Sequence, residues 1–479
     1  MTNASPTYVF PKGFVWGSAT AAIQVEGAAS LYGKGPSNWD VFCREHPEKI
    51  FDRGSPEVAC DHYHRYKEDV RLMKETGHTG YRLSIAWTRI FPEGYGRTNP
   101  EGIAFYRALF DELLASGIEP NVTLYHWDLP QTLAERGGWE NKETIEHFVH
   151  YARTCFELFG SRVRLWSTLN EPAWTTLQGY VTGLHPPNQT SHRAAIQVSH
   201  NFNVAHARVV KDFQAMKRAG AFAAGAEAQI GLVLNMSTVY PATKDPLDVR
   251  AARLADGVLN RWFIDPALKG VYPEDIWELY RSCGILPVHT ESELALFREN
   301  TVDYIGVNYY YPHYASSDAP ESAYHLNTSG KANEDCVFAI KDLFRFVKNP
   351  SGKYTDWGWE IFPEGLYELL WRAQEYRPGI PVYITENGVG MNEKLDDQGT
   401  VNDEARIEFV REHLKVAHRA ISNGVNVKGY YMWALMDNFS WVNGFKKRYG
   451  FLFVDRATQA RSIKASGRWY REVSARNGF

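Results

Sequence analysis

The sequence predicts an α/β protein, a single (β/α)8 TIM barrel with long βα loops that spans residues 1–479 as one domain. Short runs rich in β-branched and aromatic residues alternate with longer amphipathic stretches, and this alternation occurs eight times. Several of the short runs are apolar throughout, as is typical of parallel strands buried on both faces. Eight strand–helix units of this kind close into a barrel.

The expected elements follow from hydrophobic periodicity along the chain. The eight expected strands are Phe14–Ala19, Gly80–Ile85, Pro120–Tyr125, Leu165–Leu169, Ile230–Asn235, Tyr304–Asn308, Val382–Thr385 and Val427–Trp433. Helical patterns between them cover Pro100–Ser116, Glu143–Phe159, Ser191–Arg218, Pro363–Glu375 and Asp403–Asn423. The stretch Ser316–Tyr354 is polar and lacks a clear period, so we expect a long loop after the sixth strand, on the active face of the barrel.

Composition excludes several classes of function. The net charge of −4 on 479 residues gives no basis for binding nucleic acid or an anionic membrane. The five cysteines are widely spaced without a CxxC pair, which argues against a disulfide framework and a structural zinc site. The segment Met1–Lys12 has no apolar core, and no apolar run approaches the roughly 20 residues of a membrane span. We therefore expect a cytoplasmic protein with reduced thiols; the sequence does not indicate its oligomeric state.

Polar and aromatic side chains follow the predicted strands at their carboxyl ends, where TIM barrels carry their active sites. Glu171 follows the fourth strand within Thr168–Pro172, and Glu386 follows the seventh within Thr385–Gly388. Hydrolysis of a glycosidic bond needs a proton donor for the leaving oxygen and a carboxylate for the oxocarbenium-like centre. Either glutamate alone could be an ordinary surface or salt-bridged carboxylate. Two glutamates at strand ends of one barrel favour a catalytic pair.

Other residues on the same rim can support such a pair. Arg82, at the second strand, can keep a strand-seven carboxylate ionised, although an interior salt bridge would place an arginine there equally well. His126 can donate to a sugar hydroxyl or be a hydrogen-bonded core histidine. Gln24, Asn170 and Trp433 gain significance because they fall on the same rim.

These motifs resemble glycoside hydrolase family 1, from Phe14–Thr20 to Tyr449–Phe451, with both glutamate motifs intact and in order. The resemblance implies a retaining double displacement, with Glu171 as acid/base and Glu386 as nucleophile, and no metal or organic cofactor. It also implies a subsite for the glycone, with Tyr310 and Arg82 supporting the nucleophile. That subsite would be formed by Gln24, His126, Trp127, Asn170, Asn308, Tyr310 and Trp433.

One segment departs from the family's β-glucosidases, which carry a glutamate that accepts hydrogen bonds from the sugar's 4- and 6-hydroxyls. Here Asp437–Trp441 has Ser440 at that position, and Lys447 and Tyr449 follow seven and nine residues later. This spacing resembles the phosphate-binding set of the family's 6-phospho-β-galactosidases and 6-phospho-β-glucosidases. Serine in place of glutamate removes repulsion of a phosphate charge of about −1.5 to −2, and lysine and tyrosine add a cation and a hydroxyl donor. The alternative is a neutral replacement beside a solvated basic run, Lys446–Arg448.

We therefore expect the substrate to be a small phosphorylated disaccharide or aryl glycoside, a 6-phospho-β-galactoside and/or 6-phospho-β-glucoside. Such sugars are made during uptake by a phosphotransferase system, which fits a cytoplasmic location. The alternative is a β-glucosidase or β-galactosidase for unphosphorylated sugars. Trp441, a further expected substrate contact, goes with galactosides in this resemblance but is also usual in unphosphorylated β-glucosidases. Trp174, Trp357 and Trp359 either stack on the leaving group or pack loops.

The sequence argues against two other classes of protein, a non-catalytic sugar-binding protein and an unrelated barrel enzyme. Glu171 and Glu386 are both present, which argues against the first. No strand-end lysine and no glycine-rich dinucleotide motif supports an aldolase or an oxidoreductase.

Overall fold

The computed structural model describes residues 7–222, 227–331, 334 and 336–479, and its centre is a closed barrel of parallel strands in the order β1-β13-β12-β7-β5-β4-β3-β2. These strands are β1 (Val15–Ala19), β2 (Gly80–Ser84), β3 (Glu119–Tyr125), β4 (Leu165–Asn170), β5 (Gln229–Asn235), β7 (Tyr304–Asn308), β12 (Val382–Asn387) and β13 (Val427–Trp433). The prediction of an eight-stranded barrel is confirmed, and each strand ends within two residues of its predicted bounds.

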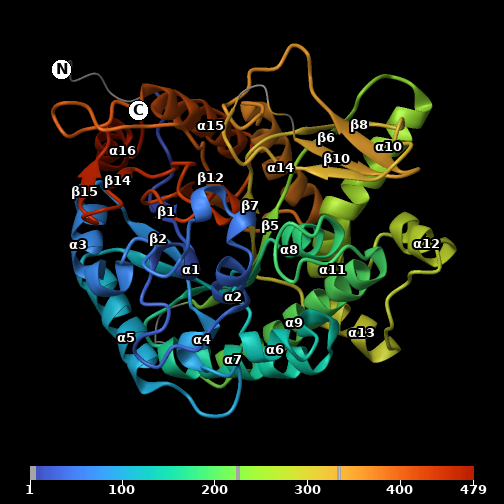
Figure 1. The fold of residues 1–479 in the computed structure, drawn as a ribbon, viewed down its shortest axis with the longest axis horizontal. Coiled ribbons are helices and arrows are strands. Elements are labelled where there is room, and N and C mark those ends of the chain that lie inside the picture. Colours follow the sequence, from blue (N-terminus) through green and yellow to red (C-terminus); the bar gives the residue numbers. More distant parts are fainter. Residues whose placement is uncertain (1–6, 223–226, 332–333, 335) are drawn as a thin grey trace.

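Helices surround the barrel, and in Figure 1 they form a ring around the central strands. The five predicted helices are present within one residue at each end: α5 (Pro100–Ala115), α7 (Glu143–Phe159), α9 (His192–Arg218), α14 (Pro363–Tyr376) and α15 (Glu404–Ser422). Local chemistry fixes where some of them begin. Asn99 caps α5 ahead of Pro100, and the Ser191 side chain accepts a hydrogen bond from Ala194 N at the start of α9.

Shorter helices connect these units. They are α1 (Ala22–Val25), α2 (Asn38–Glu45), α3 (His62–Glu75), α4 (Trp87–Ile90), α6 (Gln131–Ala134), α8 (Pro172–Thr176), α10 (Pro246–Asp256), α11 (Trp262–Lys269), α12 (Glu274–Ser282), α13 (Glu291–Glu299) and α16 (Ala465–Arg476). Two π-helical turns, Leu177–Val181 and Gly257–Arg261, follow α8 and α10. A short hairpin of β14 (Leu452–Val454) and β15 (Arg461–Ile463) precedes α16. None of the described helices combines the length and the apolar character needed to cross a bilayer.

The prediction of one long loop over Ser316–Tyr354 was wrong, because this stretch contributes strands to a second sheet. That sheet has the order β6-β8-β11-β10-β9, and Figure 1 shows it beside the barrel, at the upper right. Its strands are β6 (Val239–Pro241), β8 (His313–Ser316), β9 (Ala323–His325), β10 (Val337–Ile340) and β11 (Phe344–Val347). Strands of three or four residues are too short to show an alternation of apolar and polar residues. Whether such a segment forms a strand depends on the strands with which it pairs.

Candidate active site

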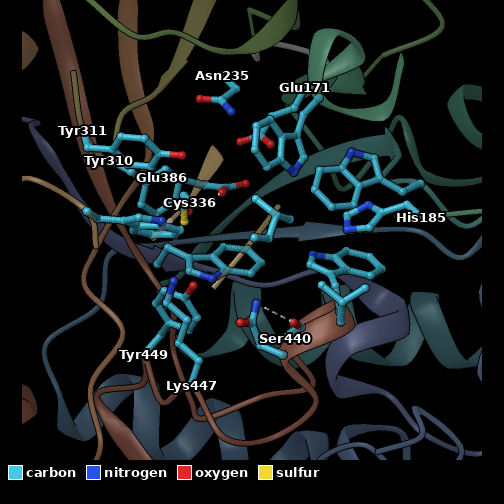
Figure 2. Close-up of a pocket in the computed structure, with 18 of the residues that line it drawn as sticks. Glu171, His185, Asn235, Tyr310, Tyr311, Cys336, Glu386, Ser440, Lys447 and Tyr449 are labelled. Carbon is cyan, nitrogen blue, oxygen red and sulfur yellow. Dashed lines mark hydrogen bonds between the residues drawn. The ribbon is translucent and has the colours of Figure 1, made fainter. Parts of the chain in front are cut away.

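A cavity lies at the carboxyl ends of the barrel strands, and Figure 2 shows the side chains that surround it. Most of the residues predicted from the sequence line it, although they come from opposite ends of the chain. Asn170, Asn308 and Arg82 do not line it but hydrogen-bond to His126, Glu171 and Glu386, respectively, which do. The predicted residues in its wall are Gln24, His126, Trp127, Glu171, Tyr310, Glu386, Trp433, Ser440, Trp441, Lys447 and Tyr449.

Glu386 lies near the end of β12, and two donors hold its carboxylate. Arg82 Nη1, from β2, donates to Glu386 Oε1 at 2.5 Å, and the Tyr310 hydroxyl donates to Glu386 Oε2 at 2.7 Å. Arg82 and Glu386 are both buried, so this ion pair is shielded from water. Both carboxylate oxygens are therefore held by hydrogen bonds, and the side chain lines the cavity.

Glu171 follows β4 directly and has a left-handed backbone conformation, with φ of 49°. This conformation costs a non-glycine residue free energy, and such strained residues are concentrated at active sites. Pro172 starts α8 immediately afterwards, where its missing N–H costs nothing. Asn308 Nδ2, from β7, donates to Glu171 Oε1 at 2.6 Å, so the carboxyl group faces the same cavity as Glu386.

The two carboxyl groups differ in how their surroundings treat a negative charge. Burial and the nearby Glu386 carboxylate raise the pKa of Glu171 to about 8, against the opposing effects of Asn308 and Arg82. Burial also raises the pKa of Glu386, but there the charge of Arg82 and the Tyr310 hydroxyl act in the opposite direction. Arg82 contacts Glu386 directly, so its charge favours the ionised form of Glu386 more than that of Glu171.

A hydrogen-bond network behind the cavity fixes the orientation of His126. Arg82 Nη2 donates to Asn170 Oδ1 at 2.7 Å, and Asn308 Nδ2 approaches the same oxygen at 3.1 Å. Asn170 Nδ2 is therefore the group that donates to His126 Nε2 at 3.0 Å. Burial and the charge of Arg82 hold the pKa of His126 well below its usual range, so the ring is neutral and its proton is on Nδ1. Nδ1 has no partner among the described residues, which leaves it available as a donor.

The loop after β13 brings Ser440, Lys447 and Tyr449 to one wall of the cavity. In Figure 2 they lie together at the bottom of the view, below the two glutamates. The Tyr449 ring centroid lies 5.4 Å from Lys447 Nζ. Lys447 is only 2% exposed, and its Nζ lies 3.2 Å from the ring centroid of Trp359. Among the described residues its ammonium has no hydrogen bond or ion pair, and burial holds the pKa of Lys447 well below its usual range.

Lys447 therefore does not belong to a solvated basic run, although both of its neighbours are basic. Lys446 is exposed, whereas Arg448 Nη1 donates to Asp437 Oδ2 at 2.8 Å. Gly390, just after β12, makes room for the lysine stem, because a Cβ there would lie 2.4 Å from Lys447 Cγ.

Buried charges hold both ends of this loop in place. Asp437 accepts hydrogen bonds from Arg448 at 2.8 Å and from Gly450 N at 2.9 Å, which ties the start of the loop to its end. Lys464 Nζ, just before α16, lies 2.7 Å from Asp437 Oδ1 and also pairs with Glu393. The loop that carries Ser440 and Lys447 is therefore held by ion pairs outside the cavity.

The wall also contains residues that the sequence did not single out. Asn235 ends β5, and Ser237 follows it; nothing in the sequence beyond a strand end could have indicated them. Three tryptophans were expected either to stack on the leaving group or to pack loops. Trp174 and Trp359 line the cavity, whereas Trp357 is fully buried beside Lys447. The remaining additions are His185, Tyr311, His313, Leu326, Asn327, Cys336, Val442 and Asn443. Among the described residues no group of three or more histidine, cysteine, aspartate or glutamate side chains is placed to hold a metal ion.

Comparison with known proteins gives the family of this chain. The model of Glycosyl hydrolase family 1 matches residues 7–479. The chain is 41% identical to the 6-phospho-beta-glucosidase GmuD of Bacillus subtilis (strain 168), over 98% of this chain and 99% of the relative. It is 43% identical to Beta-glucosidase A of Acetivibrio thermocellus, again over 98% of this chain and 99% of the relative. The beta-glucosidase from Thermotoga maritima in complex with glucoimidazole superposes with a TM-score of 0.89 at 38% identity, covering 99% of this chain and 100% of that one. The barrel, the cavity at its strand ends and these matches agree, and the chain belongs to glycosyl hydrolase family 1.

Proposed function

We propose that this glycoside hydrolase is a retaining β-glycosidase that acts on 6-phospho-β-galactosides and/or 6-phospho-β-glucosides. Glu386 attacks the anomeric carbon and forms a glycosyl-enzyme, while Glu171 protonates the leaving oxygen. Water then releases the sugar, with Glu171 acting as the base. The two environments support these roles, because Arg82 and Tyr310 favour an ionised Glu386 and a pKa of about 8 keeps Glu171 protonated at neutral pH.

The observation that carries the choice of a phosphorylated sugar is the buried, unpaired Lys447. Burial without a counter-ion holds the pKa of Lys447 well below its usual range and so disfavours the charged form, and an anion that arrives with the substrate would restore that charge. A wall that keeps such an amine is suited to a phosphate. Ser440 and Tyr449 add hydroxyl groups to the wall of the same cavity. A phosphate on O6 would receive a charge-assisted hydrogen bond from the lysine and neutral ones from the two hydroxyls.

The glycone itself would be held by the opposite wall. Trp433 lies under His126, with ring centroids 6.0 Å apart, and gives a flat apolar face for a sugar ring. The free Nδ1–H of His126 and the unpartnered Oε1 of Gln24 supply a donor and an acceptor for hydroxyls. Trp441 packs on Trp127, with ring centroids 4.6 Å apart, and lines the same cavity.

The test is a comparison of kcat/KM for nitrophenyl β-galactoside and β-glucoside with that for their 6-phosphates. We expect the phosphorylated substrates to be strongly preferred. Equal turnover of the unphosphorylated pair would refute the phosphate site and leave the alternative, a β-glucosidase or β-galactosidase. That alternative is supported by the identity to Beta-glucosidase A and by the presence of Trp441.

A charge reversal in the wall gives a second test. Ser440→Glu would put a carboxylate beside the phosphate, and at ~5 Å with an effective dielectric of ~20 the repulsion is about 3 kcal/mol for each unit of phosphate charge. We expect kcat/KM for the 6-phosphates to fall at least ~100-fold. The matched control is Ser440→Gln, which adds a side chain of the same size without the charge. An equal loss in the control would show that the effect is steric and not electrostatic.

A further inference from the structure

The wall that would receive the phosphate is hydrogen-bonded to the segment that carries the nucleophile. Arg448, the residue after Lys447, forms an antiparallel bridge with Met391, in the segment that follows β12. Arg448 N donates to Met391 O at 3.2 Å, and Met391 N donates to Arg448 O at 2.8 Å. Gly390, beside Met391, packs closely against the stem of Lys447. Lys447 and the strand that holds Glu386 therefore belong to one hydrogen-bonded unit.

A chain of side-chain contacts also joins Lys447 to the nucleophile. Lys447 Nζ lies 3.2 Å from the ring centroid of Trp359. The Trp359 ring meets the Tyr310 ring at 60°, with centroids 5.3 Å apart. The Tyr310 hydroxyl donates to Glu386 Oε2 at 2.7 Å, and both residues are labelled in Figure 2. The amine that would face the phosphate is thus connected, through two aromatic rings, to an oxygen of the attacking carboxylate.

The Lys447 end of this chain has two states, with and without an anion. Among the described residues the amine has no counter-ion, and burial holds the pKa of Lys447 well below its usual range, so the neutral form is favoured. A phosphate would favour the ammonium form. The ammonium also binds the face of an aromatic ring more strongly than a neutral amine does. An anion would therefore tighten the contact with Trp359, which packs against the tyrosine that holds Glu386.

We propose that a phosphate in this wall activates the nucleophile through Lys447 and Trp359, so that a free tetrahedral dianion such as phosphite speeds the hydrolysis of a sugar that lacks the phosphate. The inference rests on the proposed function and assigns its phosphate wall a role in rate as well as in binding. Binding energy from a non-reacting part of a substrate can be used at the reacting centre, and it then raises kcat. Trp359 is accordingly a positioning residue, because it acts on Glu386 through Tyr310.

The experiment divides the 6-phospho substrate into two pieces. Nitrophenyl β-xyloside and nitrophenyl α-L-arabinopyranoside have the gluco and galacto rings without C6, and phosphite supplies the dianion. Their kcat/KM is measured at increasing phosphite, with sodium chloride keeping the ionic strength constant. We expect a saturable rise of at least ~5-fold, at the lower end of typical coupling between two sites. Phosphite should inhibit hydrolysis of the intact 6-phosphates competitively, and these opposite effects exclude a general salt effect.

Variants test the route from the anion to the nucleophile. Lys447→Met should abolish the activation and also the rise in melting temperature that bound phosphite gives the wild type. Lys446→Met, at the exposed neighbour, should keep both. Trp359→Leu should keep the rise in melting temperature but lose the activation, because the amine remains and its contact with Tyr310 is broken. The matched control is Trp174→Leu, which changes another tryptophan of the same cavity and should keep the activation factor.

The outcomes separate this inference from the proposed function. If phosphite leaves kcat/KM of the xyloside and the arabinopyranoside unchanged, the inference is overturned. The proposed function stands in that case if the 6-phosphates are still preferred over the unphosphorylated glycosides, and it fails if they are not. Activation that persists at full size in Lys447→Met or in Trp359→Leu would also overturn the inference, since the dianion would then act elsewhere or by another route.

Discussion

Replacement of Lys447 by methionine tests the phosphate wall most sharply, because methionine keeps the length of the side chain and removes its charge. A hydrogen bond to a charged group contributes about 1.5–3 kcal/mol, and each ~1.4 kcal/mol is tenfold. Lys447 is 2% exposed and lines the cavity, so its amine would face the phosphate from a largely desolvated position. We therefore expect kcat/KM for a nitrophenyl 6-phospho-β-glycoside to fall by about 10- to 150-fold, and that for the unphosphorylated glycoside to change little.

The same substitution should not destabilise the protein. A buried polar group without a partner costs about 1–3 kcal/mol of stability in mutational studies, and methionine removes this cost. Methionine also removes the contact of the amine with the Trp359 ring, and such a contact stabilises by ~0.5–2 kcal/mol when the lysine is charged, so the two effects nearly cancel. The free energy of unfolding is therefore expected to stay level or rise in a denaturant titration. Loss of activity together with unchanged or higher stability is the signature of a residue kept for its ligand.

Lys446→Met is the control for this prediction, because Lys446 is exposed and adjacent in sequence. It should leave the ratio of the two kcat/KM values as in the wild type. The reasoning is refuted if Lys447→Met reduces activity equally on both substrates, or if Lys446→Met changes the ratio as much as Lys447→Met does.

Three further predictions concern the proton donor and the loop. The general acid acts only when protonated, so activity on the 6-phosphate should fall as the pH rises through about 8, the pKa of Glu171, and the pH–rate profile of Glu171→Gln should lack this alkaline limb. Asp437→Asn leaves the buried Lys464 without part of its counter-charge, so the free energy of unfolding should fall by about 3–5 kcal/mol in a denaturant titration. An unchanged midpoint would show that the ion pair of Asp437 and Lys464 does not stabilise the protein. Gly390→Ala puts a Cβ 2.4 Å from Lys447 Cγ, so KM for the 6-phosphate should rise while KM for the unphosphorylated glycoside stays constant; a parallel rise of both would mean general distortion.

The sequence predicted the barrel well because its strands carry their own signal. Runs such as Ile230–Leu234 are apolar throughout, as strands buried on both faces require, and eight strand patterns alternate with amphipathic helices. Strand-end placement also indicated Glu171 and Glu386, because the carboxyl ends of all barrel strands meet at one rim.

The second sheet could not be predicted in the same way. Its strands β9, β10 and β11 have three or four residues each, and β6 comes from a segment some distance earlier in the chain. A polar segment of this kind forms strands only where a neighbouring strand supplies hydrogen-bond partners for its backbone N–H and C=O groups. The tertiary structure determines which strand is that neighbour. The same stretch places Asn327 and Cys336 in the cavity wall, so those residues were missed with it.

The sequence by itself determined the reaction class, since the residue types and their positions at strand ends are enough to indicate a pair of carboxylic acids for glycoside hydrolysis. Ser440, Lys447 and Tyr449 were indicated by the resemblance of their spacing to the phosphate-binding set of the family's 6-phospho enzymes. Only the tertiary structure shows that Arg82 and Tyr310 contact Glu386 while burial raises the pKa of Glu171, and that Lys447 is buried without a counter-ion among the described residues. Both depend on burial and on distances to charges from remote strands, and these quantities arise only when the chain closes on itself.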